Sequence, residues 1–305
     1  MTVFSEGGIT VSVLGISLTN VATTEIGSPL PSYETPPVSE VVLAVSFTQL
    51  DDLGSLEILD FYRERFVGNG FTSVEEKMRY DMPVEQFGTS QVPPFRFEIA
   101  DAPPRSRYWF GHEQPDQLVQ IQSDWFARNW RRTPHGYTYP HYLTLREPFK
   151  DDLLALTEFV SARNLGSLEA IQCEITYVNE ISSDEIWNKH GQMGRVVKVW
   201  NDLPTEQMPY EPEQVQWSAS YLIGADGPVM EGAQPLMRLH VTCQPALKDG
   251  LPIYVATLTS RGAPATPDLD GVLALLDLGH EWIVRTFEAL TTDAMQHKTW
   301  KKEES

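Results

Sequence analysis

The alternation of apolar and polar residues along the chain predicts most of its secondary structure. Every second side chain of a strand points to the same face, whereas a helix brings residues three and four apart together. The first spacing predicts strands at residues 9–18, 40–47, 95–99, 107–112, 118–124, 169–181, 215–223, 236–244 and 253–259. The second predicts helices at residues 53–66, 149–163 and 269–290, with a shorter helix at 183–190.

These elements follow the order strand, helix, three strands, helix, and the order then repeats. The first pass covers residues 38–165 and the second covers residues 168–292. The pattern predicts an α+β fold of antiparallel sheets packed on long helices, and it favours a duplicated β-α-β-β-β-α unit. The expected organisation is an N-terminal extension at 1–35, a first α+β half at 36–166 and a second α+β half at 167–305 that contains the C-terminal helix.

The stretch from residue 118 to residue 142, LVQIQSDWFARNWRRTPHGYTYPHY, combines large aromatic rings with three arginines. After the strand at 118–124, apolar residues at one-turn spacing predict a helical or irregular corner. Its asparagine, and a second one in the strand at 169–181, each have two interpretations: a buried amide that fixes loop geometry, or a ligand contact. The candidate ligand-binding residues are Gln120, Gln122, Trp125, Asn129, Trp130, Arg131, Tyr177 and Asn179.

Three segments resemble a sporadically distributed, uncharacterised prokaryotic protein family. They are PPVSEVVLAVSF at residues 36–47, QIQSDWFARNWRR with YPHY at residues 120–142, and ITYVNEI at residues 175–181. The resemblance implies a common fold and assigns no activity. The scattered occurrence of such a family is typical of mobile or defence-associated genes. Residues 1–35 and 81–105 are additions relative to the family pattern, and 81–94 is predicted to be a long mobile loop.

The net charge of −19 favours some classes of binding partner over others. A strongly acidic chain repels nucleic acid and anionic membranes, so neither is expected as a partner. Residues 200–235 contain no lysine or arginine, which favours a basic protein partner. Arg128, Arg131 and Arg132 are the local exception, and they are expected to pair with the surplus carboxylates.

The chain lacks the common motifs of nucleotide binding, serine hydrolysis and cysteine zinc sites. His280–Glu281 begins like a helical zinc motif, but Val284 stands where the second histidine belongs. No metal and no cofactor are therefore predicted. Cys173 and Cys243 lie within apolar alternation and are expected to be reduced and buried. Without a signal peptide or a run of ~20 apolar residues, the sequence predicts a cytoplasmic protein.

Two functions from different classes follow. The first is a noncatalytic interaction protein, such as an antitoxin-like, immunity-like or accessory subunit, with an acidic surface. The alternative is a small-ligand binder or enzyme that uses a cavity between a curved sheet and a long helix. The sequence specifies neither the partner nor the oligomeric state.

Overall fold

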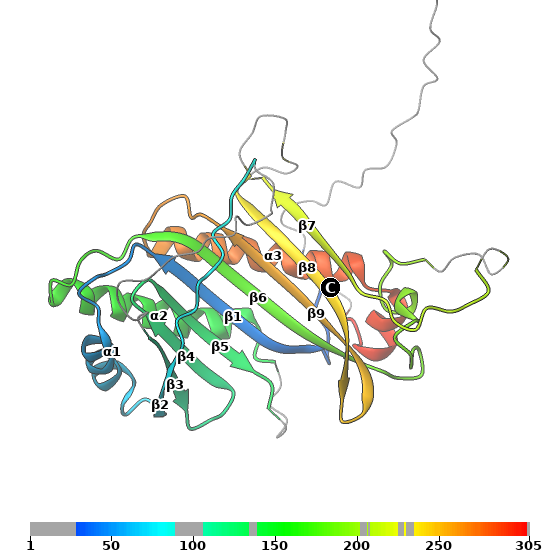
Figure 1. The fold of residues 1–305 in the computed structure, drawn as a ribbon, viewed down its shortest axis with the longest axis horizontal. Helices are drawn as coiled ribbons and strands as arrows, with labels where there is room; N and C mark the ends of the chain where they lie inside the picture. Colours follow the sequence, from blue (N-terminus) through cyan, green and yellow to red (C-terminus); the bar gives the residue numbers. More distant parts are fainter. Residues whose placement is uncertain are drawn as a thin grey trace, which may run out of the picture. The chain divides into compact units, whose positions relative to one another are not determined.

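The computed structural model describes residues 29–88, 106–133, 139–201, 206, 208–224, 229 and 235–303. These residues form one nine-stranded antiparallel sheet in the order β2-β3-β4-β5-β1-β6-β9-β8-β7 (Figure 1). The α+β class predicted from the sequence is therefore confirmed. The strands are β1 (Val38–Phe47), β2 (Phe71–Lys77), β3 (Arg107–His112), β4 (Gln117–Gln122), β5 (Trp125–Arg131), β6 (Ala170–Ser182), β7 (Trp217–Ile223), β8 (Met237–Lys248) and β9 (Leu251–Gly262).

Strands β1 and β6 pair with each other at the centre of the sheet. β5, β4 and β3 extend from β1 on one side, each pairing antiparallel with the next. β9, β8 and β7 extend from β6 in the same manner on the other side. The last strand of each group thus pairs with an earlier strand of the chain, β5 with β1 and β9 with β6. Such antiparallel neighbours can be joined without a crossover connection.

The helices cover one face of the sheet (Figure 1). They are α1 (Ser55–Phe61), which continues into η1 (Tyr62–Phe66), α2 (Tyr142–Ala162) and α3 (Leu269–Leu290), with short turns η2 (Met193–Arg195) and η3 (Met295–Thr299). Asp268 caps α3 by accepting a hydrogen bond from the N–H of Gly271. Gly279 lets α3 approach the sheet closely, because a Cβ there would lie 2.7 Å from Ile175. The main apolar core lies between these helices and the sheet.

The aromatic stretch after β4 is a strand, so the predicted helical corner is wrong. Ser123 and Asp124 form a two-residue turn, and Gln122 pairs with Trp125 across it. β5 then runs in the sheet between β4 and β1. Most of its side chains are buried on both faces, so the polar–apolar alternation that marks a one-sided strand is missing.

Three other predictions differ from the structure or lie outside it. Helix α2 begins at Tyr142 and contains Pro148, whereas the prediction began the helix after this proline. Residues 183–190 form no helix, because the Asp184 carboxylate accepts the N–H groups of Ile186 and Trp187 in a turn. The strands predicted at 9–18 and 95–99 lie outside the described residues.

Residues 78–87 form an extended segment, here called the strap. Figure 1 shows it in cyan, crossing the sheet on the face turned away from α2 and α3. We call this face the strap face. The loop predicted at residues 81–94 thus contains, in its described part, a segment that contacts β1, β4, β6 and β8.

Candidate functional site

Two buried glutamines hold the backbone of the strap. The Gln122 side chain donates to the carbonyl of Tyr80 at 2.9 Å and accepts the N–H of Tyr80 at 3.1 Å. Gln172 donates to the carbonyl of Pro83 at 3.0 Å and accepts the N–H of Glu85 at 2.8 Å. An amide side chain that satisfies both a donor and an acceptor of the main chain recognises extended backbone whatever its side chains are. The strap face therefore has the chemistry of a site for an extended polypeptide.

Glu85 anchors the strap by its charge. Its carboxylate accepts hydrogen bonds from Arg238, His240 and Arg261, and Arg261 also bonds Glu174. Burial disfavours the ionised carboxylate. However, the hydrogen bond from His240 and the positive charges of Arg238 and Arg261 outweigh it, and the pKa of Glu85 is lowered. Buried charges persist when they are paired in this way.

Apolar contacts complete the attachment of the strap. Met82 packs against Ala44 and Trp125 in a small cluster separate from the main core. The hydroxyl of Ser46 lies 2.8 Å from the sulfur of Met82. The ring of Tyr80 packs against Trp125 with 5.5 Å between centroids. The candidate residue Trp125 therefore contacts the chain's own strap.

The candidates Gln120, Asn129 and Arg131 form a network on the strap face. Gln120 donates to the Asn129 side-chain oxygen at 2.7 Å, and the Asn129 amide donates to Glu40 at 2.7 Å. Arg131 donates to the same Glu40 oxygen at 2.8 Å. The Asn129 amide thus bonds two side chains on neighbouring strands, whereas one of its two interpretations predicted that it fixes the geometry of a loop. Trp109 lies beside this network, with the guanidinium of Arg131 5.5 Å from its ring centroid.

Trp130, Tyr177 and Asn179 belong to the opposite, helix-covered face. Trp130 packs edge-on against Tyr139, whose hydroxyl lies 2.9 Å from the hydroxyl of Tyr177. The Asn179 amide donates to the carbonyl of Ala256 on β9 at 3.1 Å, which is a structural role. The eight candidates are thus divided between two faces of the sheet and do not form one site.

A chain of hydrogen bonds runs from Tyr139 through Tyr177 to His280 on α3. The Tyr177 hydroxyl lies 2.9 Å from Nδ1 of His280, and the ring of Tyr142 stacks on the imidazole with 4.1 Å between centroids. Burial lowers the pKa of His280 to about 4, although the charge of Asp277 opposes the shift. Burial likewise raises the pKa of Tyr177 well above its ordinary value. These groups are neutral near pH 7.

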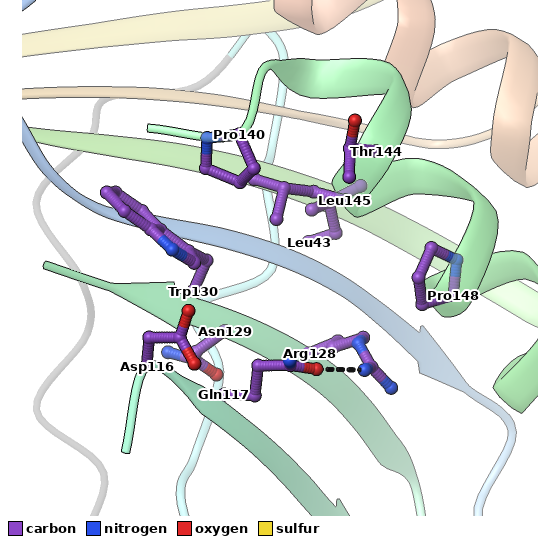
Figure 2. Close-up of a pocket in the computed structure, with 10 residues that line it drawn as sticks. All are labelled: Leu43, Asp116, Gln117, Arg128, Asn129, Trp130, Pro140, Thr144, Leu145 and Pro148. Carbon is purple, nitrogen blue, oxygen red and sulfur yellow. Dashed lines mark hydrogen bonds between the residues drawn. The ribbon is translucent and has the colours of Figure 1, made fainter. Parts of the chain in front are cut away.

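A pocket of about 180 Å³ lies between the first turns of α2 and strands β1, β4 and β5 (Figure 2). Its apolar and polar walls are formed by Leu43, Asp116, Gln117, Arg128, Asn129, Trp130, Pro140, Thr144, Leu145 and Pro148. The guanidinium of Arg128 bonds the carboxylate of Asp152 and the side chain of Gln117, at 2.7 Å in the second case. Arg65 shares Asp152, so the charge of this buried group is balanced.

The pairing expected for the central arginines is found for two of the three. Arg128 pairs with Asp152 and Arg131 pairs with Glu40, whereas Arg132 donates to the carbonyl of Pro36. Both cysteines are free and buried, as predicted. Within the described residues, no cluster of three or more histidine, cysteine, aspartate or glutamate side chains is arranged to hold a metal ion.

Sequence reasoning missed Gln172, Glu85 and Asp116. Gln172 alternates with apolar residues in a predicted strand, so its face was foreseeable although its partner was not. Glu85 and Asp116 lie in segments whose proline and glycine content predicts turns and loops, which gives no local signal of a site.

Comparison with protein-family models, curated proteins and solved structures finds no match to the chain. No described helix has both the length and the apolar character needed to cross a membrane.

Proposed function

We propose that the protein is a noncatalytic interaction protein, such as an antitoxin-like, immunity-like or accessory subunit, and that the strap face is its partner-binding surface. The observation that carries the proposal is the pair of glutamines, Gln122 and Gln172, that bind strap backbone. The same face of β6 continues beyond the strap through the half-buried Thr176. An extended segment of a partner can lie beside the strap on the same surface.

Charge favours a basic partner protein over nucleic acid. The chain carries −19 charges, which accelerate encounter with a cationic protein and repel phosphate. Two of the three arginines beside the tryptophans of β5 are neutralised by carboxylates. Few charges therefore remain for counterion release on a nucleic acid.

Three further features belong to the same proposal. We infer that the sheet is a duplicated unit, because β5, β4 and β3 extend from β1 as β9, β8 and β7 extend from β6. We assign the chain to the sporadic prokaryotic family that its segments resemble. A cytoplasmic location fits the two free thiols, Cys173 and Cys243, because a reducing compartment keeps thiols unpaired.

The test is affinity capture from the native host with two charge-matched variants. Thr257 lies on the strap face of β9, since its neighbour Leu258 faces the core, whereas Leu154 is exposed on α2. We expect wild type and Leu154→Arg to capture the same basic protein, and Thr257→Arg to lose it. Undiminished capture by Thr257→Arg, at a wild-type melting temperature, contradicts the strap face as the binding surface.

The second test is a binding titration with nucleic acid. Mixed DNA and RNA at near-physiological salt should bind no tighter than micromolar. The same titration is repeated with a triple variant in which Arg128, Arg131 and Arg132 are changed to alanine. Submicromolar binding that disappears in this triple variant overturns the proposal and makes β5 part of a nucleic-acid site.

The alternative function, a small-ligand binder or enzyme, is favoured by the pocket beside α2. Its volume of about 180 Å³ is below the ~300–1,000 Å³ of typical ligand sites, so a drug-sized ligand does not fit without movement. A thermal-shift screen of metabolites distinguishes the two functions. A stabilising metabolite whose effect is lost in Trp130→Ala favours the alternative.

A further inference from the structure

The pocket beside α2 has an acceptor without a donor. Oδ1 of Asp116 is buried and has no hydrogen-bond partner in the part of the chain that the structure describes. The neighbouring polar groups are already engaged, because Gln117 accepts from Arg128 and Arg128 also bonds Asp152. Figure 2 shows the Asp116 carboxylate on the side of the pocket where Trp130 lies, away from the Arg128 guanidinium. A buried acceptor in this position costs free energy until a donor reaches it.

A second acceptor belongs to a residue of α2 that lines the same pocket. Pro148 has no N–H group, so it cannot donate the usual helical hydrogen bond to the carbonyl of Thr144. Both residues line the pocket. The proline therefore leaves the carbonyl of Thr144 without its usual helical donor. Two acceptors, one of them charged, require a ligand that donates hydrogen bonds and carries positive charge.

The remaining walls suit an alkyl chain that ends in a cation. Leu43, Leu145 and Pro140 are apolar, and the ring of Trp130 forms the wall beside Asp116. A tryptophan face attracts a cation within ~6 Å of its centroid. A volume of about 180 Å³ accommodates one long side chain and little more.

We propose that this pocket binds an alkylammonium or alkylguanidinium group, the chemistry of a lysine or arginine side chain. Asp116 and the Thr144 carbonyl receive the donors, and Trp130 covers the charge. The group can come from a free amino acid or amine, or from a side chain of a partner protein. The second source rests on the proposed function, and it requires that the basic partner also contact the helix-covered face, where this pocket lies.

The test is calorimetric titration with butylguanidinium, butylamine and the neutral isostere butanol. We expect butylguanidinium or butylamine to bind at least tenfold more tightly than butanol. Asp116→Asn should weaken cation binding at least tenfold, whereas Glu185→Gln, which removes an exposed carboxylate elsewhere, should not change it. Equal binding of butanol, or unchanged binding by Asp116→Asn, overturns the inference, as does preferential binding of acetate through Arg128.

A second variant distinguishes loss of cation binding from loss of folding. Thr144 lines the pocket and is exposed, so Thr144→Trp is designed to occupy the space without removing a core group. It should abolish cation binding and keep the wild-type melting temperature. Retained binding in Thr144→Trp places the cation elsewhere and overturns the inference.

Two probes distinguish the sources of the cation. Free arginine binding at least tenfold more tightly than Nα-acetyl-arginine methylamide identifies a small molecule, because the blocked form mimics a residue within a chain. Equal or tighter binding of the blocked form identifies a protein side chain. These titrations contain no partner protein, so their failure leaves the capture experiment on the strap face unaffected, and failure of that capture leaves the pocket unaffected.

Discussion

The hydroxyl of Tyr177 on β6 lies 2.9 Å from Nδ1 of His280 on α3. This contact links the central strand to the final helix through two polar groups inside an apolar core. The imidazole is also stacked on Tyr142, whose hydroxyl donates to Asp277 at 2.7 Å. His280, half of an incomplete zinc motif in the sequence, is thus engaged in packing and hydrogen bonding between sheet and helix.

The state of His280 predicts a pH dependence of stability. Its folded pKa of about 4 lies below the ordinary 6.5, so the unfolded chain binds more protons between these values. The free energy of unfolding should therefore fall with decreasing pH, by about 2 kcal/mol between pH 7 and pH 5 from this group. His280→Gln should lose this component, and His297→Gln, at an exposed histidine, should keep it. Chemical denaturation at both pH values measures it, and an NMR titration of His280 centred near pH 6.5 contradicts it.

Asn129→Ala should destabilise the protein by about 1–3 kcal/mol, because the buried Gln120 and the partly buried Glu40 each lose a hydrogen bond. Both hydrogen bonds are 2.7 Å long. Urea denaturation provides the measurement. The matched control is Asn201→Ala at an exposed position, which should change stability by less than about 0.5 kcal/mol. A wild-type midpoint for Asn129→Ala removes its structural role and supports the ligand role.

Glu85→Gln should release the strap. Removing one partner of a buried ion pair costs about 3–5 kcal/mol, and here Arg238 and Arg261 both lose a carboxylate. In the wild type, the backbone N–H groups of residues 80 and 85 donate to glutamine side chains. In the variant, hydrogen exchange at these two N–H groups should accelerate. Glu64→Gln breaks only an exposed pair with Arg163 and should cost less than about 1 kcal/mol. Equal costs in the two variants disagree with a charge-anchored strap.

Cys173 and Cys243 should resist labelling in the native protein. Both thiols are buried, and burial raises the pKa of each to about 12, so little thiolate exists near pH 8. Iodoacetamide followed by mass spectrometry should modify neither cysteine in native buffer and both in denaturant. Rapid modification of either one in the folded state shows that its strand is not packed as described.

Some parts of the fold were accessible to sequence reasoning because their signals are local. The helix predicted at 269–290 coincides with α3, since an apolar stripe, the Asp268 cap and a following break lie within one continuous segment. β6 was predicted within one residue at each end, with Cys173, Ile175 and Tyr177 on the buried face. In each case neighbouring residues alone favour one conformation.

The hydrogen-bond partners of the candidate residues could not be predicted from the local sequence. Choosing Gln120, Gln122 and Asn129 was possible because amides within an apolar strand need partners. Their partners are up to 89 residues away in the chain, as between Asn129 and Glu40. No local pattern contains that pairing. The prediction of a corner in place of β5 failed for the same reason. The strap and α2 cover the two faces of β5, and β1 and β4 pair with its edges.

The sequence by itself determined most of the strands, the helix at 269–290, the class of the fold and the burial of the two cysteines, because local spacing of apolar side chains controls these properties. Only the tertiary structure decided that Trp125 packs against the strap and Trp130 against Tyr139, that the strap crosses β1 and β6, and that Pro148 and Asp116 line one pocket. These are relationships between distant segments. They depend on strand register and on which face of the sheet the helices occupy, and a one-residue change of register would exchange the side chains of a strand between the two faces.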